Sequence, residues 1–164
     1  MDETRPRTYQ LAQVNIARAL APLDSPTMQG FVEQLDPINR LAEASPGFVW
    51  RLQTEEGDAT ALRVFADERI IVNLSVWDSL EALQDFVYGS AHLNLLRNKK
   101  QWFEKPSEPI LALWWVPSGH IPSIEDAKQA LATLRAQGPS PSAFSFASPF
   151  AQPGKPTAKH QLQS

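Results

Sequence analysis

One segment of the chain concentrates side chains that can do chemistry. "FVYGSAHLNLLRNKKQWF", residues 86–103, places one histidine among aromatic and basic side chains. An imidazole with an ordinary pKa of about 6.5 can take up or release a proton near neutral pH. His92 is therefore the candidate general acid or base, and Tyr88, one helical turn earlier, is expected on the same helix face. The alternative is that His92 hydrogen-bonds a neighbouring carbonyl at a helix junction.

The other ionisable groups do not form a recognisable catalytic or metal motif. His120 falls in a predicted loop and His160 in a predicted tail, and no histidine has a partner at the spacing of a metal-ligand pair. The chain has no cysteine, so we predict neither disulfides nor thiolate metal sites. Arg97 is assigned to a solvated face, with the alternative that it holds a substrate carboxylate. The sequence shows no triad, glycosidase pair or glycine-rich nucleotide loop.

The elements that must position His92 follow from hydrophobic periodicity. The pattern predicts strands at 8–17, 48–53, 69–77 and 110–116, and a short edge strand at 61–65. Helices are predicted at 28–44 (kinked or divided at Pro37), from Asp78 to 102 with a break at Gly89-Ser90, and at 124–136. This order is that of a ferredoxin-like βαββαβ fold of the α+β class, with an antiparallel sheet. The domain is predicted to span 8–137, and the Pro/Ser/Ala/Gln-rich residues 138–164 to form a tail without a core.

Alternation along the strands predicts one apolar and one polar sheet face. The apolar positions of the first and third strands are assigned to the helix side: Ala12, Val14, Ile16, Val72, Leu74 and Val76. The polar positions are then assigned to the opposite side: Gln13, Asn15, Asn73, Ser75 and Trp77. The second strand adds Trp50 or Arg51 to that side, and the last strand adds Trp114 or Trp115. Amides, a hydroxyl and indoles suit an apolar cavity with a few orienting groups. The alternative is a wetted sheet face whose tryptophans are buried in a dimer interface.

Composition restricts the class of protein. The chain has 164 residues with a net charge of −3, which fits one soluble domain and argues against a nucleic-acid surface built on positive charge. No apolar run is long enough to cross a bilayer. The start, "MDETRPRTYQ", lacks the apolar core of a secretory signal. We therefore predict a cytoplasmic protein without nucleic-acid or membrane partners.

Four stretches together resemble a known family: "LAQVNIARALAPLDSPTMQGFVEQLDPIN", "ASPGFVWRLQ", "VNLSVWDSLEALQDFVYGSAH" and "WFEKPSEPILALWWVPSGHIPS". They resemble the DUF3291 family of uncharacterised bacterial proteins over about residues 9–146. That family is similar to the dimeric α+β barrels, which include antibiotic-biosynthesis monooxygenases, EthD-like proteins and haem-binding relatives. The resemblance does not give a reaction. The strand order and the strand "ILALWWV", which is apolar on both faces, predict a homodimer formed sheet to sheet, because an exposed apolar sheet face would be unfavourable in a monomer. The site candidates that match its motifs are Asn15, Trp50, Arg51, Asn73, Trp77, Tyr88, His92, Trp102 and Trp114.

These observations predict a binding site for a small apolar or aromatic organic molecule. We expect His92, Trp77, Asn73 and Asn15 to line one cavity. In the enzyme hypothesis, a cofactor-independent monooxygenase or isomerase, His92 acts as acid or base and the asparagines orient a carbonyl or enolate. The alternatives are a non-catalytic protein that binds haem, with His92 as axial ligand, or a lipid-like metabolite, and a purely structural dimer.

Overall fold

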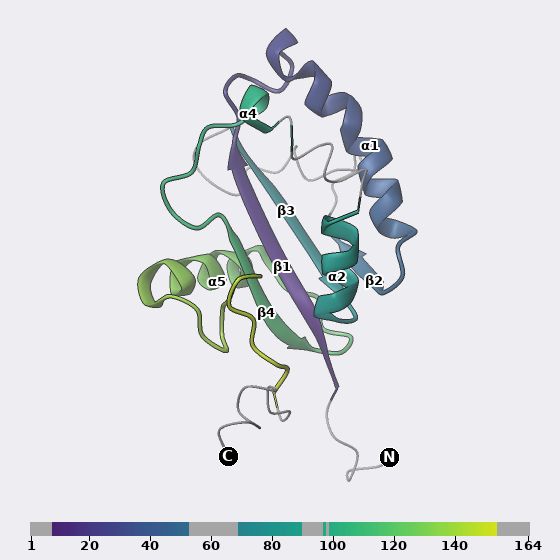
Figure 1. Ribbon diagram of the computed structural model, residues 1–164, viewed down its shortest axis with the longest axis vertical. Coiled ribbons are helices and arrows are strands. Elements are labelled where there is room, and N and C mark those ends of the chain that lie inside the picture. The colour runs from purple at the N-terminus through teal and green to yellow at the C-terminus, as the bar shows by residue number, and fades with distance from the viewer. Residues whose placement is uncertain (1–7, 53–68, 90–96, 98, 154–164) are drawn as a thin grey trace.

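The computed structural model describes residues 8–52, 69–89, 97 and 99–153, and Figure 1 shows its architecture. Its centre is one antiparallel sheet of four strands in the order β2-β3-β1-β4. The strands are β1 (Tyr9–Arg18), β2 (Phe48–Arg51), β3 (Ile70–Trp77) and β4 (Leu111–Pro117). Both central strands, β1 and β3, are flanked by a partner on each side, which is the ferredoxin-like arrangement that the sequence predicted. The predicted edge strand at 61–65 lies outside the described residues.

Helices cover both faces of the sheet. They are α1 (Gln29–Glu43), preceded by the short 3-10 helix η1 (Pro26–Met28), α2 (Leu80–Val87), α4 (Lys99–Trp102) and α5 (Ile124–Gln137). In Figure 1, α1 and α2 lie on one side of the sheet and α5 crosses the other side at β4. α1 is one helix with Pro37 inside it, not two. The hydrogen bond that Pro37 cannot donate would reach the carbonyl of Glu33, an exposed residue that water can serve instead.

The predicted assignment of the two sheet faces was wrong. Leu11 and Trp77 share a buried cluster with Ala42 of α1 and Leu83 of α2, so the polar side chains that alternate with the apolar set face α1 and α2. The apolar set packs instead against α5, in a cluster with Ala12, Val14, Ile16, Val72, Leu74, Val76, Ala127, Ala130, Leu131 and Leu134. Because a helix covers each face, apolarity of the strand residues could not identify which helices cover which face.

The C-terminal residues were predicted to form a tail without a core, but residues 139–153 pack against the sheet. Phe144 pairs with Leu113 at the edge of β4 through two backbone hydrogen bonds of 2.8 Å. Ala143 and Phe144 are both 0% exposed. The indole N–H of Trp115 donates to the Phe150 carbonyl at 2.9 Å, and the Phe146 ring lies 6.1 Å from that of Tyr88. We call residues 139–153 the C-terminal strap, because they fasten β4 to the end of α2.

Side-chain caps fix the starts of α2 and α5. The helix predicted to start at Asp78 starts at Leu80, and its cap is Ser79, whose Oγ accepts from the Ala82 N–H at 3.0 Å. At α5 the cap is a complete capping box. Ser123 Oγ accepts from the Asp126 N–H at 3.0 Å, and Asp126 Oδ2 accepts from the Ser123 N–H at 2.9 Å.

The α5 capping box gives a pH-dependent prediction. The Ser123 N–H, and secondarily the Ser123 hydroxyl and His120, hold the pKa of Asp126 below its usual range. A lowered folded-state pKa stabilises the protein above the unfolded pKa, and the gain is lost as the pH falls through the folded value. We expect Asp126→Asn to cost about 0.5–1 kcal/mol at pH 7. Urea denaturation at pH 7 and at about pH 3, below the usual aspartate pKa, should show the gap closing; an equal gap at both would contradict this.

Candidate functional site

The strand register gathers polar side chains on the sheet face that α1 and α2 cover. Ser75 lies at the centre of one cross-strand row, opposite Gln13 on β1 and Arg51 on β2. In the next row Asn15 lies directly opposite Asn73. Directly opposed residues of antiparallel strands point to the same face. The five side chains therefore form one patch, which we call the polar patch.

Gln13, Ser75 and Asn73 form a hydrogen-bond network, which Trp77 joins at Ser75. Gln13 Nε2 donates to Ser75 Oγ at 2.8 Å and also to Asn73 Oδ1. The Trp77 indole N–H donates to the same Ser75 Oγ at 2.9 Å. Gln13 is 5% exposed and Ser75 is 6% exposed, so these bonds satisfy groups that would otherwise be costly to bury. Since Ser75 Oγ already accepts two hydrogen bonds, its own O–H remains available as a donor.

The two asparagines keep unused hydrogen-bonding capacity. Asn73 uses Oδ1 as the acceptor from Gln13, and the residue is exposed. Asn15 is half-buried, and its side chain makes no hydrogen bond to any other residue in the described ranges. An amide offers two donors and one acceptor. The polar patch is therefore buried and hydrogen-bonded at Ser75, whereas at Asn73 it is exposed and its amide groups can bind a ligand.

An aromatic wall closes one end of the polar patch. Trp77 is 1% exposed and lies between two rings. Phe86 of α2 stacks on it with centroids 5.3 Å apart and planes at 26°. Phe48 meets it edge-on at 5.4 Å and 88°. The wall fixes the indole, so its N–H points steadily at Ser75.

Arg51 brings a positive charge to the patch together with its counter-ion. Its Nε lies 2.8 Å from Oε2 of Glu43, which is the last residue of α1. The arginine side chain is only 12% exposed, whereas that of Glu43 is 41% exposed. The pair ties the C-terminal end of α1 to β2, and the carboxylate offsets the guanidinium charge beside the patch.

The remaining predicted site residues lie elsewhere. Trp50 and Trp114 belong to the opposite face, against α5, and the tryptophan of β4 that faces the helices α1 and α2 is Trp115. Trp102 packs against Phe31 of α1 at the far end of the sheet, with ring centroids 5.8 Å apart. Tyr88 is 56% exposed at the end of α2. His92 lies outside the described residues, so its role stays a prediction, as does any cavity that it shares with the asparagines.

The prediction therefore placed Asn15, Asn73 and Trp77 on one face and left the choice between Trp50 and Arg51 open, which the register decides for Arg51. It did not count Gln13 and Ser75 among the site residues. The signal for these two was present, because both alternate with core positions and lie opposite each other once the strand order of the sheet is known. Among the described residues, no group of three His, Asp or Glu side chains is placed to hold a metal ion. None of the helices in the described ranges is long and apolar enough to span a membrane.

The four-stranded antiparallel sheet with its helices is of the α+β class. The chain belongs to the DUF3291 family, a domain of unknown function, whose family model matches residues 10–160. No curated protein matches the chain significantly.

Several solved structures match the chain at low sequence identity, with TM-scores below 0.5. PA3566 from Pseudomonas aeruginosa is 12% identical with a TM-score of 0.47, over 71% of this chain and 100% of that one. A putative antibiotic biosynthesis monooxygenase from Nitrosomonas europaea is 12% identical with a TM-score of 0.46, over 73% and 98%. SnoaB, a cofactor-independent oxygenase from Streptomyces nogalater, is 15% identical with a TM-score of 0.44, over 70% and 98%.

Proposed function

We propose that the polar patch binds a small, largely apolar organic molecule through an oxygen of that molecule, such as a carbonyl, enol or phenol oxygen. The observation that carries this proposal is the Gln13–Ser75–Trp77 network, which ends beside the unbonded amide of Asn15 and the exposed Asn73. Sites for small molecules combine apolar walls with a few fixed polar groups. Here Trp77, Phe48 and Phe86 supply the wall, and the amides and the Ser75 hydroxyl supply the polar groups.

The donors suit an oxygen that becomes negatively charged. An enolate or phenolate oxygen is stabilised by N–H and O–H groups that are already oriented before the charge develops. Ser75 is held by two incoming hydrogen bonds, so its O–H needs no large rearrangement to donate. Side-chain amide N–H groups of Asn15 and Asn73 would add further donors. Within this proposal the ligand is an enolisable or phenolic molecule.

The proposed reaction begins with removal of a proton from the bound ligand, with His92 as the base. The resulting electron-rich anion then has two fates in the proposal. In an isomerisation, His92 returns the proton to a different atom of the ligand. In an oxygenation without cofactor, dioxygen is the oxidant: one of its oxygen atoms forms a carbonyl at the deprotonated CH₂ carbon of the ligand, and the other leaves as water with the two hydrogens lost from that carbon. Both reactions use the same anion-stabilising donors, so substitutions in the polar patch would affect both alike. Only the oxygenation consumes dioxygen, so measured oxygen consumption would separate them.

Ligand binding is testable without knowing the natural substrate. We expect simple phenols, 1,3-diketones or naphthols to raise the melting temperature of the wild-type protein, because a ligand that binds only the folded state stabilises it. Asn15→Leu and Asn73→Leu should each weaken binding about tenfold, which corresponds to the loss of one hydrogen bond of roughly 1–1.5 kcal/mol. Thermal-shift titrations measure both effects.

Two controls sharpen this test. Gln137→Leu changes an amide at the exposed end of α5, on the other side of the sheet, and should bind as the wild type does. His92→Ala should retain binding but lose turnover of any ligand that is converted. If the two asparagine variants bind all tested ligands as tightly as the wild type, the polar patch is only a satisfied part of the core and the proposal fails. A Soret band that follows haem addition and vanishes in His92→Ala would instead support the haem-binding alternative.

The homodimer predicted from the sequence also stays a proposal. α5 packs over the apolar sheet face at β4 and β1, so a partner copy would have to contact the part formed by β2 and β3. There Trp50, Leu52 and Ile70 are only partly buried. Sedimentation velocity should show a dimer at micromolar concentration, and a stable monomer would exclude it.

A further inference from the structure

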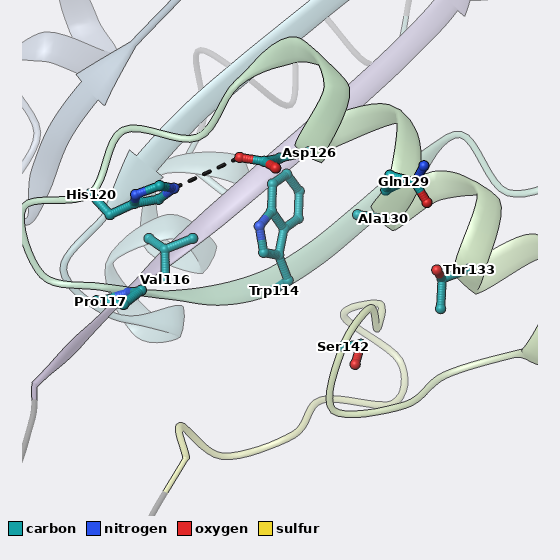
Figure 2. A pocket seen from close by; sticks show the side chains of 9 residues that line it. All are labelled: Trp114, Val116, Pro117, His120, Asp126, Gln129, Ala130, Thr133 and Ser142. Atoms are coloured by element: carbon teal, nitrogen blue, oxygen red, sulfur yellow. Dashed lines mark ion pairs between the residues drawn. The ribbon is translucent and has the colours of Figure 1, made fainter.

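A groove of about 310 Å³ lies on the sheet face opposite the polar patch. Figure 2 shows it between the end of β4, the loop that follows β4, the first turns of α5 and the start of the C-terminal strap. Its volume is at the lower end of the range of roughly 300–1,000 Å³ that is typical of small-molecule sites. Its polar lining comes from Trp114, His120, Asp126, Gln129, Thr133 and Ser142.

Trp114 offers a hydrogen-bond donor to this groove. The residue is 9% exposed, and its indole N–H has no hydrogen bond to any residue in the described part of the chain. Among the described residues, no fully buried side-chain nitrogen or oxygen lacks a partner, so this N–H is accessible from the groove and not sealed in the core. Figure 2 shows the nitrogen edge of the indole turned towards the His120 side of the groove. The indole N–H groups of Trp77 and Trp115, by contrast, already donate to protein oxygens. An oxygen acceptor of a ligand in the groove can therefore reach the Trp114 N–H.

The charges of the groove restrict the ligand further. No lysine or arginine is among the described residues that line it, whereas Asp126 adds a carboxylate. His120 Nε2 lies 3.7 Å from Asp126 Oδ2, and both side chains are about half exposed. A carboxylate without a fixed cation repels anions, so a phosphate or carboxylate ligand is disfavoured. Hydroxyl and amide groups, by contrast, both donate and accept.

We propose that this groove binds a neutral, polyhydroxylated molecule of about the size of a monosaccharide. The Trp114 N–H donates to one ligand oxygen, and the Asp126 carboxylate accepts from a ligand hydroxyl. Thr133, Ser142 and Gln129 exchange hydrogen bonds with the remaining hydroxyls. The apolar side chains of Val116 and Ala130 lie against the C–H groups of the ring. Because the groove is open to solvent along its length, we expect affinity on the order of millimolar.

The test follows the Trp114 N–H directly by ¹H–¹⁵N correlation NMR. The chain has five tryptophans, so five indole signals are expected, and the signal of Trp114 is the one that is missing in Trp114→Phe. Titration with D-glucose and with D-ribose should shift this signal saturably at millimolar concentration, while the Trp77 signal on the other face stays still. Sodium acetate and ethylammonium chloride, at the same concentrations, should produce no saturable shift.

Substitutions in the groove distinguish sugar binding at this site from a general effect of sugar on the solvent. Gln129→Leu and Ser142→Ala should weaken sugar binding at least fivefold, whereas Gln137→Leu, on the same helix but outside the groove, should bind as the wild type does. If Trp114→Phe does not fold, Ser142→Ala assigns the signal through its change of shift. The proposal is overturned if neither sugar gives a saturable shift, if only acetate or ethylammonium does, or if Gln129→Leu and Ser142→Ala bind sugar unchanged. A negative result for the groove does not count against ligand binding by the polar patch, because the two sites lie on opposite faces of the sheet.

Discussion

Replacing Phe144 by alanine is expected to lower the free energy of unfolding by about 3–5 kcal/mol, the usual cost of removing a fully buried phenylalanine ring. Phe144 is 0% exposed and packs in the cluster that contains Leu11, Trp77 and Leu113. The Trp115 and Phe150 rings lie 6.5 Å and 5.8 Å from it. Removal of the ring would leave a cavity beneath α2 and release the strap from β4. Urea denaturation followed by far-UV circular dichroism measures the change.

The strap contains its own control. Phe146 is only half-buried and touches Tyr88, an exposed residue, so Phe146→Ala should cost about 1 kcal/mol or less. Similar costs for the two variants would contradict the assignment of Phe144 to the core. A cost below about 1 kcal/mol for Phe144→Ala would show that the strap is not a structural part of the domain.

The second large effect is expected at Gly47, where the chain turns from α1 into β2. Its φ is +84°, and a Cβ added there would lie 2.5 Å from the Cβ of Ala82 in α2. The left-handed backbone costs an alanine roughly 1–2 kcal/mol, and the overlap adds roughly 1–3 kcal/mol. Gly47→Ala should therefore lower the free energy of unfolding by about 2–5 kcal/mol, as measured by urea denaturation.

Gly119 provides a matched control for the steric part of this effect. Its φ is +89°, but nothing lies within 4 Å of an added Cβ. Gly119→Ala should lower the free energy of unfolding only by the backbone contribution of roughly 1–2 kcal/mol. Adding Ala82→Gly to Gly47→Ala should recover part of the loss, because it removes the overlapping methyl group. Equal costs at the two glycines, with no recovery, would refute the close approach of α2 to the turn.

The strand order was predictable because it depends on local patterns. Alternation in β1 and β3, the apolar run of β4 and the Ser123/Asp126 start of α5 are each properties of a few consecutive residues. That Asn15 and Asn73 lie on the same sheet face followed from the fold, since β1 and β3 are neighbours in it, but their direct pairing is known only from the register. The direction of the sheet faces was not predictable in the same way, because it depends on where α5 returns to the sheet.

Composition misled the prediction for the C-terminal strap. Proline and serine dominate residues 139–153, and such composition usually cannot build a core. Phe144 nevertheless needs no core of its own, because it enters one already formed by Leu11, Trp77 and Leu113. The candidate site was partly predictable for the same kind of reason. Polar residues at alternate positions identified the polar patch, but only the register shows that Ser75 receives hydrogen bonds from both Gln13 and Trp77.

The backbone pairing of Leu113 with Phe144 has a consequence for the colloidal behaviour of the protein. β4 is an outer strand of the sheet, and an outer strand offers hydrogen-bonding groups on which strands of other molecules can assemble. The strap occupies that position at Leu113, and Pro141 and Pro149 on either side of Phe144 cannot donate backbone hydrogen bonds to an incoming strand. The same fifteen residues that complete the core thereby block edge-to-edge aggregation, so selection for solubility and selection for stability act on one short segment.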